Sequence, residues 1–153
     1  MLLKPHVGWT DFSLPGTRFY GLSYLDDIAF NWLDAAVFGL EHLLPFCVKG
    51  FMEPGRFLCT VSYWNCHIIT EEDGKDELTD EDITSELSHT SMLDFCRMLY
   101  DDISAYPDDW AGFVDYNGSS DKEKKKLLIK KLGTLKKLIE EKSVYFDERH
   151  CFL

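Results

Sequence analysis

Long apolar runs are missing from this sequence of 153 residues. A membrane-spanning helix needs about 20 consecutive apolar residues, but the densest apolar stretch, Ile28–Leu44, is interrupted by Asn31, Asp34 and further polar side chains. The first residues also lack the basic start and the apolar run of a secretory signal peptide. We therefore expect a cytoplasmic protein without a membrane partner.

Regular cysteine spacing is missing as well. The five cysteines are an odd number without a repeat, which argues against a secreted disulfide framework. Neither Cys-x-x-Cys nor His-x-x-x-His occurs, so we expect no metal site. We predict that Cys59, Cys66 and Cys96 are reduced and buried as small apolar side chains, and that Cys151 is the most reactive thiol.

Motifs for catalysis and cofactor binding are also lacking. There is no Gly-x-Ser-x-Gly elbow and no phosphate-binding glycine loop, so we predict no catalytic residue and no cofactor. A hydrolase that uses two carboxylates or a Cys/His pair stays open as an alternative, because such partners meet in space rather than in sequence. The adjacent carboxylates are Asp26-Asp27, Glu71-Glu72, Asp101-Asp102 and Asp108-Asp109.

Basic side chains are scarce in the middle of the chain. Residues 71–120 carry two basic and fifteen acidic side chains, whereas residues 121–153 carry ten basic and six acidic ones. The net charge is −11 at pH 7, with a pI near 4.8. Because nucleic acid and anionic membranes repel such a field, a basic protein is the better electrostatic match.

The sequence is nevertheless rich enough in apolar residues (45%) and aromatic residues (14%) to form a packed core. Strand patterns come first and helical patterns follow, which predicts a single α+β domain over residues 1–153. We expect an antiparallel sheet of about five strands, with one helix inserted after the first hairpin and two or three C-terminal helices. The expected strands are 7–14, 17–25, 46–52, 56–63 and 65–70, and the expected helices are about 26–43, 88 or 91–105, 107–114 and 120–142.

Capping residues support these helix starts. Asp26 or Asp27 is placed to cap the first helix, and Ser91 with Asp94 resembles a capping box for the second. Ser120 with Glu123 forms a better capping box for the last helix. We expect its inner seam to consist of Leu128, Leu132, Leu135 and Ile139, with lysines on the other faces.

The first seventy residues contain a recognisable succession. Trp9-Thr10-Asp11-Phe12 is followed by Ser23-Tyr24-Leu25-Asp26-Asp27 and then by Asn31-Trp32-Leu33-Asp34-Ala35. This strand, strand and helix order resembles small immunity proteins of bacterial polymorphic-toxin and contact-dependent inhibition systems, over about residues 7–70. The resemblance implies a cytosolic antidote that binds its cognate toxin and blocks it without chemistry of its own.

The acidic stretch supplies a candidate surface for such a partner. We predict partner binding by carboxylates around one aromatic anchor, because interface hot spots favour such anchors while charges steer encounter. The alternative is that the tryptophan lies in the core and the aspartates cap helices. A homo-oligomeric structural subunit that associates through its aromatic surface is a further alternative. The candidate residues are Asp101, Asp102, Asp108, Asp109 and Trp110.

Overall fold

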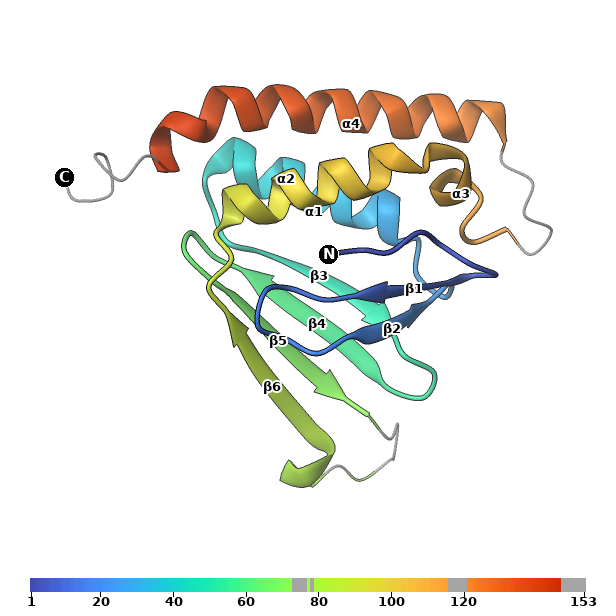
Figure 1. Ribbon diagram of the computed structural model, residues 1–153, viewed down its shortest axis with the longest axis vertical. Helices are drawn as coiled ribbons and strands as arrows, with labels where there is room; N and C mark the ends of the chain where they lie inside the picture. Colours follow the sequence, from blue (N-terminus) through green and yellow to red (C-terminus); the bar gives the residue numbers. More distant parts are fainter. Residues whose placement is uncertain (73–76, 78, 116–120, 147–153) are drawn as a thin grey trace.

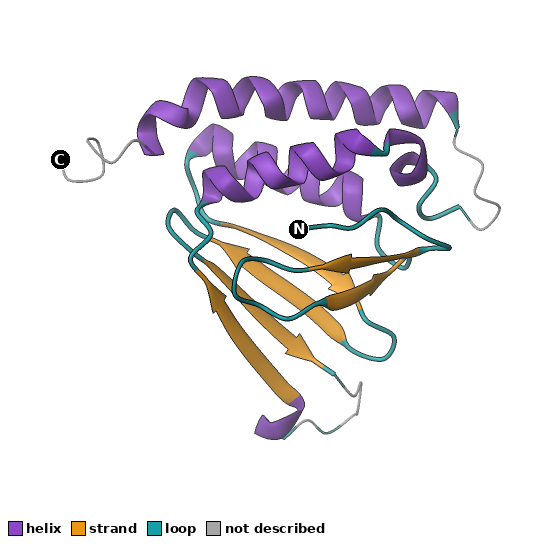
Figure 2. Ribbon diagram, in the orientation of Figure 1, coloured by secondary structure: helices purple, strands orange, loops and turns teal. Residues whose placement is uncertain are grey.

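The computed structural model describes residues 1–72, 77, 79–115 and 121–146. It confirms the α+β class, but the strands form a two-stranded sheet and a separate four-stranded sheet instead of one sheet of about five strands. The α-helices gather in one half of the molecule and the strands in the other (Figure 2). In chain order the elements are β1 (Trp9–Phe12), β2 (Tyr20–Ser23), α1 (Ile28–His42), β3 (Phe46–Phe51), β4 (Arg56–Val61), β5 (Cys66–Glu71), η1 (Asp80–Asp82), β6 (Ile83–Ser88), α2 (Met92–Ala105), α3 (Pro107–Ala111), α4 (Lys122–Lys142) and η2 (Ser143–Phe146).

The first two strands form the antiparallel hairpin that the Pro15-Gly16 turn predicts, although each strand is shorter than the sequence pattern suggests. Phe12 pairs with Tyr20, and both side chains are buried. Trp9 lies on the opposite face and is 40% exposed. The hairpin therefore contributes one apolar face to the core, as side-chain alternation along a strand requires.

The larger sheet has the order β3-β4-β5-β6, and all its neighbours are antiparallel. The expected strands at 46–52, 56–63 and 65–70 are confirmed as β3, β4 and β5, with small differences at their ends. Alternate side chains of these strands form one buried face. Its apolar members are Phe46, Val48, Phe57, Cys59, Val61, Cys66 and Ile68.

The sequence pattern does not predict β6. A half-buried strand normally alternates apolar and polar residues, but the inward positions of β6 are Thr84, Glu86 and Ser88. Other segments satisfy these polar groups; for example, the Ser88 hydroxyl donates to the carbonyl of Pro15 at 2.8 Å. Because these partners are distant in the sequence, local periodicity gives no sign of the strand.

Helix α1 begins directly after Asp27, as expected, but Asp27 does not cap it. Its side chain makes no capping hydrogen bond, and its carboxylate instead lies 3.1 Å from the ammonium group of Lys124 in α4. The predicted capping role is therefore wrong, because a long-range ion pair takes the carboxylate. Leu43 ends the helix in the left-handed conformation, with φ of 51°.

The other helices agree with the sequence pattern more closely. Ser91 caps α2, since its hydroxyl oxygen accepts from the backbone N–H of Asp94 at 3.1 Å. Helix α3 begins at Pro107 as expected but ends at Ala111 rather than Val114. In α4 the buried seam includes three of the four expected residues, while Ile139 is only partly buried beside it. The buried residues of α4 are Leu128, Leu132, Leu135 and Leu138.

Helix α4 runs parallel to α1. Asp27 pairs with Lys124, and one heptad further along both helices Asp34 pairs with Lys131. An equal spacing on the two helices requires that they run in the same direction along one seam. Parallel helix dipoles repel each other slightly, and these two ion pairs offset that repulsion.

The elements form three layers (Figure 1). Helix α4 packs against α1, α2 and α3, and α1 packs against β3. At the centre the Trp32 ring is stacked on Phe57 and Phe95, with centroid distances of 6.1 and 6.4 Å, and meets Phe12 edge-on at 5.3 Å. Its indole nitrogen donates to the carbonyl of Lys49 at 2.8 Å. One aromatic cluster thus joins the hairpin, both inner helices and the sheet.

Some expected features lie outside the described residues. These are the reactivity of Cys151 and most of the segment 144–153, which the sequence leaves as a last strand or an irregular tail. Ser120 also lies outside them, but its expected capping role is corrected, because Asp121 caps α4 by accepting from the backbone N–H of Glu123 at 2.9 Å. Within that segment Val144–Phe146 belongs to the 3-10 helix η2. The acidic and polar composition of residues 71–82 predicts a surface loop, but Glu71 still belongs to β5 and Asp80–Asp82 form η1.

Two glycines in helices give a test of this packing. A Cβ on Gly39 of α1 would lie 2.1 Å from Cδ1 of Phe46, whereas a Cβ on Gly133 of α4 would meet nothing within 4 Å. We expect Gly39→Ala to lower the free energy of unfolding by about 1–3 kcal/mol through overpacking. The matched variant Gly133→Ala should raise it by about 0.5–1 kcal/mol through helix propensity. Urea unfolding of both variants measures this, and equal shifts of the same sign would contradict the packing of α1 on β3.

Candidate partner-binding site

The outer face of α2 borders a groove. The apolar residues Met92, Phe95 and Leu99 of α2 point into the core, so Asp94, Arg97 and Asp101 are left on the opposite, solvent-facing side. The hairpin turn and the segment after β6 form the other walls. The groove has a volume of about 330 Å³ and is lined by Pro15, His89, Thr90, Asp94, Arg97, Met98 and Asp101.

The charges in this groove are unequally paired. Arg97 lies 3.4 Å from the Asp94 carboxylate, one helical turn away. Among the described residues, none forms an ion pair with Asp101. Met98 and Pro15 add apolar surface beside it. A lysine or arginine side chain fits this arrangement, because its aliphatic stem packs on apolar groups while its charged end pairs with a carboxylate.

The structure separates the carboxylates that the sequence places in one surface. Asp101 lines the groove, and Asp109 is exposed in the first turn of α3. Asp108 pairs with Lys125 of α4 at 2.8 Å. Asp102 is partly buried and accepts a hydrogen bond from the backbone N–H of Leu2 at 2.8 Å. Two of the four carboxylates therefore make contacts within the molecule. Partner binding by any of the four stays a prediction.

Trp110 is not an exposed anchor. Its side chain is fully buried and packs against Phe113, with ring centroids 5.2 Å apart. Its indole nitrogen is buried without a hydrogen-bond partner among the described residues. The short helix α3 packs against α4, which turns the tryptophan toward the core. The alternative that places Trp110 in the core is the correct one.

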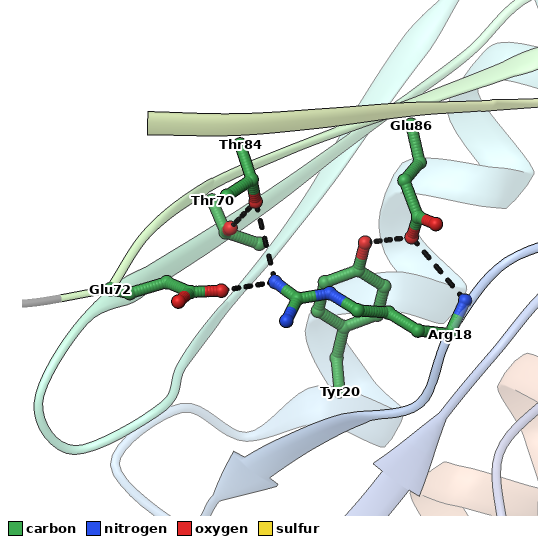
Figure 3. Close-up of polar contacts among 6 residues, drawn as sticks. All are labelled: Arg18, Tyr20, Thr70, Glu72, Thr84 and Glu86. Atoms are coloured by element: carbon green, nitrogen blue, oxygen red, sulfur yellow. Dashed lines mark hydrogen bonds and ion pairs between the residues drawn. The ribbon is translucent and has the colours of Figure 1, made fainter. Parts of the chain in front are cut away.

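A second group of polar side chains joins the hairpin to the strands β5 and β6 (Figure 3). The Tyr20 hydroxyl donates to Glu86, and the Arg18 guanidinium lies over the Tyr20 ring at 4.7 Å. Arg18 also pairs with Glu72 and donates to the Thr84 hydroxyl at 3.3 Å. These contacts satisfy the polar inner side of β6 and hold the hairpin on it.

The same group shifts two pKa values. Burial, followed by the hydrogen bond to the Glu86 carboxylate, raises the pKa of Tyr20 to about 12. The hydrogen bond to Glu72 raises the pKa of Arg18 above its usual range. Tyr20 therefore stays protonated and donates a hydrogen bond at neutral pH. Its hydroxyl thus serves as a hydrogen-bond donor that joins the hairpin to β6.

The carboxylate pairs considered for acid–base chemistry are divided among different partners. Asp26 accepts from the side-chain amide of Asn31 at 2.8 Å, while Asp27 pairs with Lys124. Burial raises the pKa of Asp27, and Lys124 opposes that shift. Glu71 pairs with Arg56 across the outer face of the sheet, whereas Glu72 pairs with Arg18.

Histidine side chains that contact a hydroxyl or a thiol are the other candidates for a nucleophile and its base. His67 lies 3.3 Å from the Ser85 hydroxyl on the open outer face of the sheet. In the described part of the chain, no cysteine is hydrogen-bonded to a histidine. A nucleophile and its base also need a third group that orients the base and donors that stabilise an oxyanion. Among the described residues, no such group accompanies the His67–Ser85 contact.

Three of the cysteines lie in the core, as expected. Cys59, Cys66 and Cys96 are fully buried, whereas Cys47 is exposed on β3. A hydrogen bond with Cys66 and burial raise the pKa of Cys59, and burial raises that of Cys96 to about 12. Within residues 1–72, 77, 79–115 and 121–146, no three His, Cys, Asp or Glu side chains are grouped to hold a metal ion.

No family model matches the sequence, and neither a curated protein nor a solved structure matches this chain. None of the helices in the described part is both long enough and apolar enough to cross a membrane. Function therefore has to be inferred from the surfaces themselves. The α2 wall of the groove could have been found from the spacing of Asp94, Arg97, Met98 and Asp101, which places these residues on one helix face.

The Tyr20–Glu86 contact predicts how stability changes at alkaline pH. Folding raises the pKa of Tyr20 from 10.0 to about 12. The contribution of the Tyr20 proton to the free energy of unfolding is therefore complete below pH 10 and is lost as the pH rises toward 12. A tyrosinate absorbance titration should show one of the seven tyrosines titrating late. Tyr20→Phe should remove this late step, and Glu86→Gln should move it to lower pH. A late step that persists in Tyr20→Phe would assign it to another residue.

Thiol exposure predicts the order of labelling. In a Cys151→Ser background, Cys47 should react with a thiol reagent under native conditions, because it is exposed. Cys59, Cys66 and Cys96 should react only at the rate of unfolding, since they are buried. Adding Cys47→Ser should abolish the fast phase. A fast thiol that remains in the double variant would contradict the buried positions.

Proposed function

We propose that this protein is a non-catalytic binding protein that neutralises a basic protein partner, in the way an immunity protein neutralises its cognate toxin. The observation that carries the proposal is the α2 groove, in which the unpaired carboxylate of Asp101 stands beside the apolar side chains of Met98 and Pro15. Such a groove suits a cationic side chain of another protein. The resemblance of residues 7–70 to immunity proteins is in accord with it.

The distribution of ion pairs supports the same proposal. The lysines of α4 neutralise carboxylates of α1 and α3, through Lys124, Lys131 and Lys125. The outer face of α2 receives none of these cations, so Asp94, Arg97 and Asp101 leave it with a net negative charge. Toxins that act on nucleic acid carry basic clefts, and an acidic inhibitor gains association rate from steering toward such a surface.

A charge-matched pair of variants tests the groove. The probe is the protein encoded by the adjacent reading frame, since immunity genes generally lie beside their toxin genes. Asp101→Asn should slow association with this protein about three- to tenfold at low ionic strength and weaken its salt dependence. Glu140→Gln removes the same charge from the exposed face of α4 and should change the rate much less.

Co-expression gives the functional readout. If the neighbouring protein inhibits growth, wild-type protein should restore growth in proportion to its amount, as expected for a stoichiometric complex. Equal association rates for Asp101→Asn and Glu140→Gln would remove the α2 groove from the interface. Protection at strongly substoichiometric amounts would overturn the binding mechanism in favour of a catalytic one.

A further inference from the structure

The outer hydrogen-bonding edge of strand β6 is largely unpaired within the described part of the chain. The backbone N–H of Glu72 donates to the carbonyl of Asp82, and that of Ser62 donates to Asn65 at the β4–β5 turn. Hydrogen-bonded pairs alternate with non-hydrogen-bonded pairs in an antiparallel ladder. Given the observed register, these two bonds show that the backbone N–H and C=O groups of every second residue of β6 point toward β5. The backbone groups of the other residues point away from it. The residues whose N–H and C=O groups face away are Ile83, Ser85 and Leu87.

The opposite edge of the same sheet is protected. In β3 the backbone groups of Lys49 face away from β4 by the same alternation, because the N–H of Met52 donates to Gly55 at the β3–β4 turn. Trp32 donates its indole N–H to the carbonyl of Lys49, and β2 packs beside β3. Among the described residues, one such bond occurs at the start of β6, where the N–H of Ile83 donates to the carbonyl of Asp80. The outward backbone groups of Ser85 and Leu87 have no comparable bond to a described residue.

The sequence of β6 also lacks the usual protections of an edge strand. Proteins discourage edge pairing with lysine, proline, bulges or inward-pointing charges. β6 has neither lysine nor proline, and it pairs one-to-one with β5 without a bulge. Its one inward charge, Glu86, is bound by Tyr20. Ile83 and Leu87 are 46% and 67% exposed on its outer side, so the edge is open and partly apolar.

We propose that two copies of this chain pair through β6, antiparallel, about a two-fold axis at Ser85. In this register Ser85 lies opposite Ser85 of the second copy, and Ile83 lies opposite Leu87. The Ser85 pair exchanges both of its hydrogen bonds. In each Ile83–Leu87 pair the N–H of Leu87 donates to the carbonyl of Ile83, while the N–H of Ile83 keeps its bond to Asp80. The exposed apolar side chains then pack against one another on the outer face. The two sheets become one continuous sheet, and the arrangement is self-complementary, as a two-fold interface requires.

The charges near β6 agree with this arrangement. The acidic turn Asp80–Asp82 precedes β6, and His89 follows it. Antiparallel pairing directs the acidic turn of each copy toward His89 of the other. The two acidic turns lie at opposite ends of the paired strands, about 20 Å apart. Because the Debye length is about 8 Å at physiological salt, their mutual repulsion is screened. The imidazole of His89 can donate a hydrogen bond to a carboxylate of the turn that faces it.

Two substitutions of the same residue test the pairing. The N–H of Ser85 faces away from β5, so Ser85→Pro removes a donor that the fold does not use and introduces a residue that edge strands tolerate. Ser85→Ala removes the hydroxyl that contacts His67 but keeps that N–H. Sedimentation analysis should show a monomer–dimer equilibrium with a Kd of about 1–100 μM for wild type and Ser85→Ala. Ser85→Pro should weaken dimerisation at least about tenfold with an unchanged circular dichroism spectrum.

A disulfide trap tests the register independently. In a Cys47→Ser, Cys151→Ser background, Ser85→Cys should form an intermolecular disulfide on mild oxidation, because directly opposed hydrogen-bonded residues have Cα atoms about 5.5 Å apart. Leu58→Cys, which lies on the outer face of the inner strand β4, should not. Added salt should strengthen the dimer, since each copy carries a net charge of −11.

The outcomes are decisive in both directions. Wild-type protein that stays monomeric at several hundred micromolar would overturn the proposal and leave the edge to a strand of another protein. Equal crosslinking of Ser85→Cys and Leu58→Cys would overturn the register. If Ser85→Pro fails to fold, the double variant Ile83→Lys, Leu87→Lys supplies the same comparison, because both side chains point to solvent.

Discussion

The hydrogen bond from Trp32 to the carbonyl of Lys49 is the contact on which the other packing relations depend. It ties α1 to the outer edge of β3 while the indole ring fills the space between Phe57 and Phe95. The direction of α1 across the sheet is thereby set. Helix α4 follows that direction, because its lysines pair with Asp27 and Asp34 at equal spacing. The same bond closes one edge of the sheet, so further pairing is restricted to β6.

The uneven distribution of charge along the sequence divides the molecular surface into parts whose carboxylates are paired with lysines and parts whose carboxylates are not. The basic last helix does not neutralise the acidic stretch as a whole; it pairs mainly with α1 and with Asp108 of α3. One of these pairs is costly, since burial raises the pKa of Asp27 in spite of Lys124. The positions of the cations therefore decide which carboxylates remain available. Those on the outer face of α2 do, and the proposed function depends on them.

The fold could be predicted from the sequence wherever a local pattern specifies an element. The capping serine of α2, the proline that opens α3 and the alternation of β3 to β5 each specify their own element. Strand β6 could not be predicted, because Thr84 and Glu86 face inward and find their partners in the hairpin. For a similar reason the sequence wrongly predicts a capping role for Asp27 and does not decide whether Trp110 is an exposed anchor or a core residue. Their environments depend on α4, about a hundred residues away in one case, and no local pattern encodes such a contact.

The candidate site could be predicted only in part. The sequence places acidic groups in α2 and α3, but it does not show that Asp102 serves the N-terminal segment or that Pro15 and His89 close the groove. His89 also connects the two proposals, because it follows β6 directly and lines the α2 groove. A second copy paired at β6 directs its acidic turn toward this histidine, while a basic partner in the groove brings cations to the same place. Because these charges are of opposite sign, the acidic turn of the second copy adds to the negative field at the groove, so binding of a basic partner and pairing at β6 favour each other by linkage.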